Sequence, residues 1–313
     1  MHPAFSVIFF TVASGAGFGL FAVLYFADAL KLGGGPGPMQ IVLAGVAALA
    51  LVAAGLTSSL FHLANPKNAW RAFSRFRTSW LSREGVFAML FFPFAAAYLG
   101  LTWLEPGGLE VLRLAAGAVA TVLAWITLFS TGMIYACLKT IRQWNTPLVP
   151  ANYLVLGHFS GALLLLVLMQ PEAAAADVYL NLAMALLIAG ALLKAIYYFW
   201  IAEAGVGSTI NTATGFTRAK VKLLDAGHTH GTFLTQEFGF RIARRYAVML
   251  KLFVFAAAFV LPLLALLGAF GAPGLAVVAA STVLAAGGLV VERWLFFAEA
   301  RHVVNLYHGA QRC

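Results

Sequence analysis

Eight long apolar segments, separated by short polar or Gly/Pro-rich breaks, most constrain the fold of this chain. They cover about 4–29, 39–63, 84–104, 109–138, 151–169, 178–202, 246–270 and 274–298. Runs of about 20 apolar residues are long enough to cross a bilayer as helices. Backbone amides must be hydrogen-bonded inside the hydrocarbon, and these runs lack the alternation of barrel strands. The sequence therefore predicts an all-α, polytopic bundle of eight transmembrane helices that forms a single transmembrane domain, 1–313.

The composition supports this class and excludes several others. Of the 313 residues, 62% are hydrophobic and 10% are charged, whereas soluble domains have about 25% charged residues. The net charge of +9 is explained by basic loops, so we expect no nucleic-acid partner. Two cysteines cannot supply the thiolate ligands of an iron–sulfur cluster, and no C-x-x-C-H motif is present for a c-type haem.

The distribution of basic residues predicts the orientation in the membrane. Lysines and arginines gather in the loops after the second, fourth and sixth segments and in the C-terminal tail, whereas the opposite loops have Lys31 as their one basic residue. Loops rich in Lys and Arg remain on the cytoplasmic side. We therefore expect both termini and the long loop 203–245 to be cytoplasmic. That loop is either a docking surface for a partner or a basic connection.

The segment 61–85, FHLANPKNAWRAFSRFRTSWLSREG, concentrates charge and aromatic residues between two spans. Wound as an α-helix at 100° per residue, 67–80 places four aromatic residues within an arc of about 120°. They are Trp70, Phe73, Phe76 and Trp80, and Lys67, Arg71 and Arg75 lie opposite. This pattern is typical of an amphipathic helix in the membrane interface. Arg77 falls among the aromatics, where it either snorkels or points into a site.

His62 closes the second segment and Glu84 opens the third, so a helix–loop–helix connection can bring both to one membrane face. Either residue alone is typical of a solvated helix end. Together, beside aromatics, they indicate a quinone or quinol site, because an imidazole can hydrogen-bond a ring oxygen and a carboxylate can exchange the proton. From the geometry we add Arg83, Arg77 and Trp70 to this candidate site.

Two other functions use similar residues. A secondary transporter or channel is the main alternative, although transporters place charges near the midplane and Lys194 and Glu292 are the clearest charges inside the segments. An inert tether is the other alternative, and it predicts no effect of Glu84→Gln on quinol-coupled turnover. Glu292 and Arg293 each need a partner of opposite charge on a neighbouring span.

The segment 61–85, the opening MHPAFSVIFFTVASGAGFGL and the late VERWLFFAEARH resemble the membrane anchor subunit family of dimethyl sulfoxide reductase over nearly the whole chain. The resemblance implies a bacterial inner-membrane complex with a molybdopterin catalytic subunit and a ferredoxin-like iron–sulfur subunit on the cytoplasmic side. This chain would exchange electrons with the quinone pool without carrying the terminal chemistry. In that family the histidine of an H-L-x-x-P motif and the glutamate that opens the next span belong to the quinol site, and they match His62 and Glu84.

The resemblance leaves the terminal substrate and the direction of electron flow open. A sulfite- or formate-type dehydrogenase would reduce quinone through the same pocket in which a sulfoxide reductase oxidises quinol. Haem b would require two facing histidines. The candidates are His62 and His158, which we place in the first turns of the fifth span, but the family's anchors carry no haem. His228 and His230 form an H-x-H pair that can bind a metal, but no cysteine lies nearby in the sequence.

Overall fold

The computed structural model describes residues 4–63, 65–104, 107–169, 173–203, 207–225, 227, 230, 245–268 and 274–312; the side chains of residues 62, 173–176 and 203 lie outside that description. Eight helices in this part are long and apolar enough to cross a membrane. The first six are α1 (Phe5–Ala29), α2 (Pro38–Ser59), α3 (Trp80–Leu104), α4 (Glu110–Ala136), α5 (Leu148–Met169) and α6 (Ala173–Glu203). The predicted all-α membrane bundle is confirmed.

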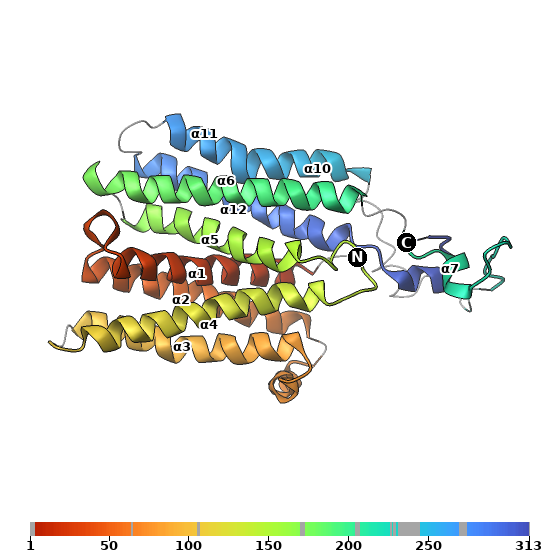
Figure 1. Cartoon of the computed structure of the whole chain (residues 1–313), viewed down its shortest axis with the longest axis horizontal. Helices are drawn as coiled ribbons and strands as arrows, with labels where there is room; N and C mark the ends of the chain where they lie inside the picture. The colour runs from red at the N-terminus through yellow and green to blue at the C-terminus, as the bar shows by residue number, and fades with distance from the viewer. Residues whose placement is uncertain are drawn as a thin grey trace.

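The seventh span is composite. It consists of α10 (Ala247–Val254), a π-helical turn (Phe255–Val260) and α11 (Leu261–Gly268). Pro262 lacks a backbone N–H and its ring crowds the carbonyl four residues earlier, and the wider π turn precedes it. The eighth span, α12 (Leu275–Ala298), packs against this turn. Figure 1 shows α1–α4 in one half of the bundle and α5, α6 and α10–α12 in the other.

Several predicted helix boundaries differ from the observed ones. Helix α3 begins at Trp80 instead of residue 84, because its first turn contains the polar residues Ser82 and Arg83 and therefore precedes the apolar segment. Helix α5 begins at Leu148, since Pro150 is tolerated in a first helical turn. Helix α2 ends at Ser59, and residues Leu60–His62 continue as a 3₁₀ turn.

Close helix contacts depend on glycine. A Cβ added to Gly19 of α1 would meet the Gly157 carbonyl oxygen of α5 at 1.9 Å, and one added to Gly17 would meet the Ala48 oxygen of α2 at 2.7 Å. Such close approach is typical of small residues at membrane helix interfaces. Helices α1 and α5 are accordingly the most buried spans, and they join the two halves of the bundle.

The segment after α2 is not the amphipathic α-helix that the sequence predicts. Residues Pro66–Arg75 form a 3₁₀ helix, η3. Its turn contains three residues, so Trp70 and Phe73 remain on one edge because they are three apart. The basic residues are four apart, and they therefore separate onto three different edges. The predicted aromatic face is retained in part, and the opposite basic face is lost.

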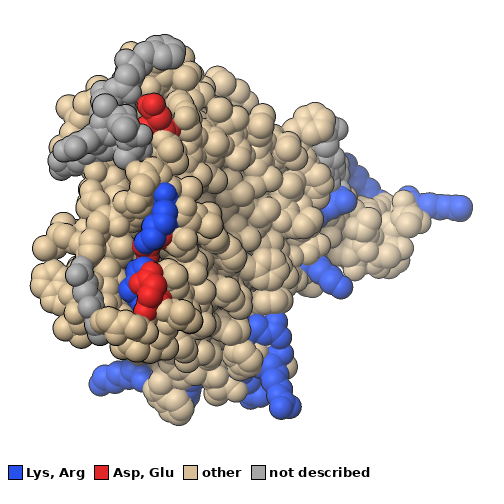
Figure 2. All heavy atoms as spheres, turned by 60° about the vertical axis from the view of Figure 1, so that its left-hand side comes forward, with Lys and Arg blue, Asp and Glu red and all other residues tan. Residues whose placement is uncertain are grey.

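Helix α1 begins and α12 ends at the same end of the bundle, where Figure 1 also marks the N and C termini. The loops after α2, α4 and α6 lie at this end. We call it the basic end, after the lysines and arginines of these loops. Figure 2 turns the opposite end forward, and most of its surface carries no charge apart from a small group of acidic and basic side chains. The bundle thus has the charge asymmetry behind the predicted orientation; the side of the membrane stays a prediction.

The long loop 203–245 is described in part. Its short helix α7 (Ile210–Thr214) is attached to the C-terminal tail by a β-bridge between Thr209 and Arg312. The Ile210 amide also donates a 3.0 Å hydrogen bond to the Gln311 carbonyl. Figure 1 shows this unit projecting beyond the basic end of the bundle. His228 lies outside the described residues, so the H-x-H prediction stays a prediction.

Candidate functional site

Glu84 lies in the second turn of α3 and is 4% exposed. Its Oε1 accepts a 2.5 Å hydrogen bond from the Thr131 hydroxyl of α4. Within the described residues, Thr131 is the one hydrogen-bond partner of Glu84, so Oε2 has none there. A carboxyl group held this way inside a membrane bundle is expensive to bury and indicates a functional site.

Aromatic side chains cover the connection that leads to Glu84. Phe73 of η3 packs onto α3 so closely that a Cβ on Gly85 would lie 3.2 Å from its ring. The Phe76 and Phe87 rings meet edge to face at 5.5 Å. Phe73 and Phe76 are each more than 40% exposed. An apolar, partly open surface therefore lies beside a buried carboxyl, as a flat apolar ring with polar oxygens would require.

The structure places the other predicted site residues on the same connection. Arg83 donates hydrogen bonds to the carbonyl oxygens of Phe76, at 3.0 Å, and Arg77, at 2.7 Å. Its guanidinium also lies 4.2 Å from the Trp80 ring centroid. Arg83 therefore clamps the turn between η3 and α3, which holds the start of the helix that carries Glu84. Arg77 itself is exposed.

Trp70 and His62 lie further along the same connection. Trp70 is 65% exposed, and the Arg71 guanidinium lies 5.8 Å from its ring. The backbone of His62 ends the 3₁₀ turn after α2, and its side chain lies outside the described residues. The pairing of His62 with Glu84, and the membership of Arg77, Trp70 and Arg83 in the site, stay predictions.

His158 does not lie in the first turns of the fifth span, as predicted, because α5 begins at Leu148 and His158 is near its middle. Both ring nitrogens are hydrogen-bonded: the Trp125 indole N–H donates to Nε2 at 2.7 Å, and Nδ1 lies 2.7 Å from the Leu154 carbonyl. A haem ligand needs a free ring nitrogen, so this arrangement disfavours the His62–His158 pair. No group of three or more metal-binding side chains occurs among the described residues.

A line of buried and half-buried polar side chains continues from Glu84 across the bundle. Thr131 and Tyr135 are four residues apart, so they share one face of α4. The Tyr135 ring stacks on Tyr153 of α5 at 6.1 Å between centroids. The Arg293 guanidinium of α12 lies 4.0 Å from the Tyr153 centroid. Arg293 is therefore the nearest basic residue in this line of contacts.

Glu292 forms an ion pair with Lys194 of α6, and both side chains are 1% exposed. The prediction that Glu292 needs a partner on a neighbouring span is confirmed, and Lys194 is that partner. Two helices that are far apart in the sequence are thus joined by charge inside the membrane. The same prediction is not confirmed for Arg293: its Nη2 lies 3.5 Å from Glu292 Oε2 on the same helix, and no carboxyl of another span pairs with it among the described residues.

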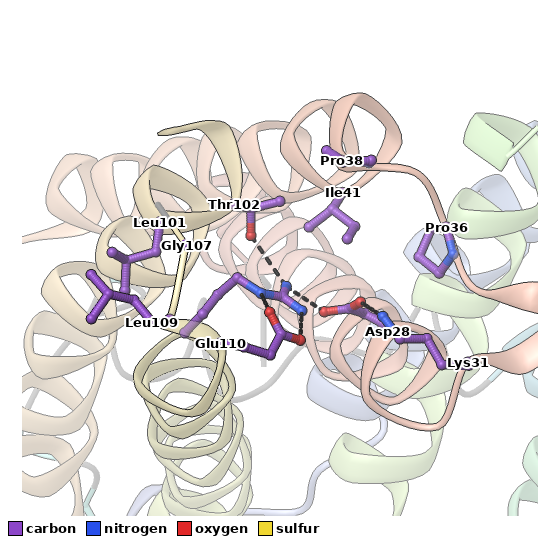
Figure 3. Close-up of a pocket in the computed structure, with 12 residues that line it drawn as sticks. Asp28, Lys31, Pro36, Pro38, Ile41, Leu101, Thr102, Gly107, Leu109 and Glu110 are labelled. Carbon is purple, nitrogen blue, oxygen red and sulfur yellow. Dashed lines mark hydrogen bonds and ion pairs between the residues drawn. The ribbon is translucent and has the colours of Figure 1, made fainter. Parts of the chain in front are cut away.

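A separate cavity of about 380 Å³ lies at the opposite end of the bundle (Figure 3). Asp28 of α1, 0% exposed, accepts hydrogen bonds from Arg113 at 2.6 Å and from Tyr98 at 2.7 Å. Arg113 also binds Glu110, and Lys31 binds Asp28. This cavity borders Thr102, which is about 27 Å from Glu84 along α3. It is therefore distinct from the Glu84 site.

The sequence reasoning missed several of these residues. A lone aspartate near the end of the first span and a lone arginine near the start of the fourth are intramembrane charges, and this signal could have identified Asp28 and Arg113. No local pattern distinguishes Thr131, Tyr135 or Tyr153 from ordinary span residues. Their roles depend on contacts between helices.

The fold and the buried ionisable groups define a polytopic helical membrane protein with a candidate carboxyl site near its basic end. A family model described as DMSO reductase anchor subunit (DmsC) matches residues 1–298, and the chain belongs to this family. It is therefore a membrane anchor subunit of a molybdoenzyme complex. A similar protein is a sulfite dehydrogenase subunit of Allochromatium vinosum, 34% identical over 333 aligned residues that cover 98% of this chain and 99% of that protein.

Proposed function

We propose that this chain anchors a sulfite-oxidising molybdoenzyme to the membrane and passes its electrons to quinone at Glu84. The similarity to a subunit of a sulfite dehydrogenase along the whole chain favours this substrate and direction. The description of the family favours a second candidate, in which quinol is oxidised and a sulfoxide is reduced. Both candidates use the same site in this chain.

The single observation that carries the quinone site is the buried Glu84 carboxyl with one oxygen fixed by Thr131 and the other available. A quinone bound there would accept two electrons from the iron–sulfur partner and two protons, which yields quinol. Glu84 would donate a proton from Oε2 to a ring oxygen and then take up another. Thr131 would hold Oε1 in place, and His62 would hydrogen-bond the second ring oxygen.

The partner subunits would dock at the basic end of the bundle, on the cytoplasmic side. The unit formed by α7 and the C-terminal tail projects beyond this end, which is also the end at which α3 begins. Ferredoxin-like partners must approach the quinone closely to transfer electrons. In the catalytic partner, sulfite and water would give sulfate, two protons and two electrons, so the overall reaction is balanced.

The first experiment isolates the tagged chain from its native membrane in mild detergent and identifies co-purifying proteins by mass spectrometry. We expect a molybdopterin subunit and an iron–sulfur subunit in stoichiometric amounts. The purified complex is then tested for sulfite-dependent quinone reduction and for quinol-dependent sulfoxide reduction. Sulfoxide reduction alone would select the second candidate. A chain that purifies alone and catalyses uptake into liposomes would contradict both and support a transporter.

The Glu84→Gln variant tests the site. The amide retains the shape but cannot exchange the proton, so we expect quinone reduction to fall by roughly a hundredfold, which is within the usual contribution of a general acid. Sulfite oxidation with a soluble dye as electron acceptor should be unchanged. Glu110→Gln, the same replacement at the opposite end, is the control. Equal quinone reduction by Glu84→Gln and wild type would contradict the site and support an inert tether.

A further inference from the structure

The buried and half-buried polar side chains beyond Glu84 form one series, which we call the polar row; Thr131 and Tyr135 are linked by lying one turn apart on α4, and the other neighbours by direct contacts. It crosses α3, α4, α5, α12 and α6 and reaches α10. Its members are Glu84, Thr131, Tyr135, Tyr153, Arg293, Glu292, Lys194, Tyr198, Lys251 and Glu299. The row begins at a carboxyl that is almost fully buried and ends at a more accessible ion pair.

The far end of the row opens toward solvent at the basic end. Lys194 Nζ lies 4.9 Å from the Tyr198 ring centroid, and Lys251 Nζ lies 5.0 Å from the same ring. Lys251 and Glu299 form a 2.8 Å ion pair with side chains 24% and 16% exposed. Glu299 directly follows the last residue of α12. The row therefore connects Glu84 with the surface on which the basic loops lie.

Several buried polar atoms in the middle of the row lack a hydrogen bond in the described part of the chain. Within the described residues, the Tyr153 hydroxyl, Arg293 Nε, Glu292 Oε2 and the Tyr198 hydroxyl have no well-aligned hydrogen-bond partner. Tyr153, Glu292 and Arg293 are 3%, 1% and 5% exposed. Buried polar atoms without a partner are costly, and proteins usually satisfy them with internal water.

A cavity of about 20 Å³ borders Tyr153, Arg293, Thr11 and Ser160. A buried water needs a cavity volume of about 10–15 Å³ and two to four polar partners. The cavity meets both conditions, because a phenol, a guanidinium and two hydroxyl groups line it. It lies where the row passes from α5 to α12, which is the step between Tyr153 and Glu292.

We propose that the polar row is a hydrated proton path that supplies Glu84 from the basic end of the bundle. This inference rests on the proposed quinone site and adds the route by which its protons arrive. Water beside Tyr153 and Arg293 would relay a proton from Glu292 Oε2 toward the phenol hydroxyls and Glu84. Each relay group accepts one proton and releases one, so its net charge is unchanged after a turnover. For every quinone reduced, two protons enter at Lys251–Glu299 and both end on the quinol oxygens.

The charges along the row favour this use over a purely structural one. A fixed arginine in a narrow pore repels protons, but here carboxyl groups lie on both sides of Arg293, at Glu292 and at Glu84. A structural ion pair would also need only Lys194 and Glu292. The Tyr153 hydroxyl and Arg293 Nε, which lie between that pair and Glu84 in the row, have no role in such a pairing. Buried acid–base series inside membrane proteins typically mark proton relays.

X-ray radiolytic footprinting of the purified complex tests the hydration without reference to activity. Hydroxyl radicals formed from ordered internal water label neighbouring side chains, and mass spectrometry locates the label. We expect Tyr153 to be labelled at least about tenfold faster than Phe21, which is 0% exposed in an apolar environment. Equal, slow labelling of Tyr153 and Phe21 would overturn the proposal of a hydrated row.

The Tyr153→Phe variant tests the proton path, because it removes one hydroxyl and preserves the ring. We expect quinone reduction to fall about tenfold, with a larger solvent deuterium isotope effect, unchanged quinone affinity and partial rescue by added imidazole buffer. The control is Tyr179→Phe, which removes a hydroxyl bonded to the Leu32 carbonyl oxygen at the other end and should behave as wild type.

The outcomes separate the two proposals. If the wild-type complex reduces no quinone, the proposed function fails. If wild type is active and Tyr153→Phe matches Tyr179→Phe in rate and isotope effect, the proton path fails and the quinone site stands. If Tyr153→Phe loses quinone affinity in proportion to its rate, Tyr153 acts in binding, and the path is again contradicted.

Discussion

At the scale of single residues, the candidate site depends on Glu84 and Thr131, and the sequence indicates only the glutamate. A glutamate at the start of an apolar segment is visible in the sequence, but alone it is typical of a solvated helix end, and only the structure shows that it is buried. Its hydrogen-bond donor, Thr131, is 47 positions away on another span. Thr127, one turn earlier, has the same residue type, and both hydroxyls bond the carbonyl four residues earlier on α4, but only that of Thr131 also reaches the Glu84 carboxyl. Only the packing of α3 on α4 distinguishes the two threonines.

Replacing Thr131 with valine should therefore impair the site although the carboxyl remains. A hydrogen bond to a charged group contributes about 1.5–3 kcal/mol, so we expect quinone reduction to fall about tenfold or more. Thr131→Ser should retain most of the activity because it keeps the donor. Thr127→Val is the matched control and should behave as wild type. Steady-state assays of the purified complex measure the effect, and equal rates for the two valine variants would contradict it.

At the scale of elements, hydropathy locates the spans but not the fine geometry of their connections. All eight segments become helices because length and apolarity decide that outcome in a membrane. The 3₁₀ form of Pro66–Arg75 was not predictable from the same pattern, because aromatics spaced by three are compatible with both helix types. The polar start of α3 was missed for a related reason, since a helix can extend past its apolar part.

The glycines of α1 provide a test of how tightly the two halves of the bundle are joined. Gly19→Ala would bring its Cβ to 1.9 Å from the Gly157 carbonyl oxygen, so α1 and α5 must separate. Overpacking of this kind costs about 1–3 kcal/mol, and we expect a lower Tm of the complex in detergent. Gly15→Ala, one turn earlier, has nothing within 4 Å of the added Cβ and is the control. A Tm loss of equal size in both variants would show that contact with α5 is not the cause.

At the scale of the whole molecule, the sequence predicts the number of spans and the charge asymmetry between the two ends, and the structure has both. The sequence could not predict that a line of polar groups crosses six helices, because each helix contributes only one or two of its members and no local pattern links one helix to the next. Lys194 and Glu292 are visible as charges, but their pairing requires α6 and α12 to be neighbours. Long-range contacts of this type are decided by helix packing.

The orientation of the molecule can be tested with the exposed thiol of Cys137, which follows the last residue of α4 at the basic end. In a Cys313→Ser background, a membrane-impermeant maleimide should label Cys137 in inside-out vesicles and not in right-side-out vesicles. Gly107→Cys, combined with Cys137→Ser, places a thiol in the turn before α4 and should show the reverse. Labelling of Cys137 in right-side-out vesicles would show that the orientation is the reverse of the predicted one.

The β-bridge between Thr209 and Arg312 also has a consequence for biogenesis. The surface around α7 is built from two segments whose synthesis is separated by the last two spans. It can take its final shape only after residue 312 has been synthesised and both spans have been inserted. A partner that recognises this surface would therefore engage a fully inserted anchor and would ignore nascent or truncated ones. The geometry of the tail could thus act as a checkpoint for assembly.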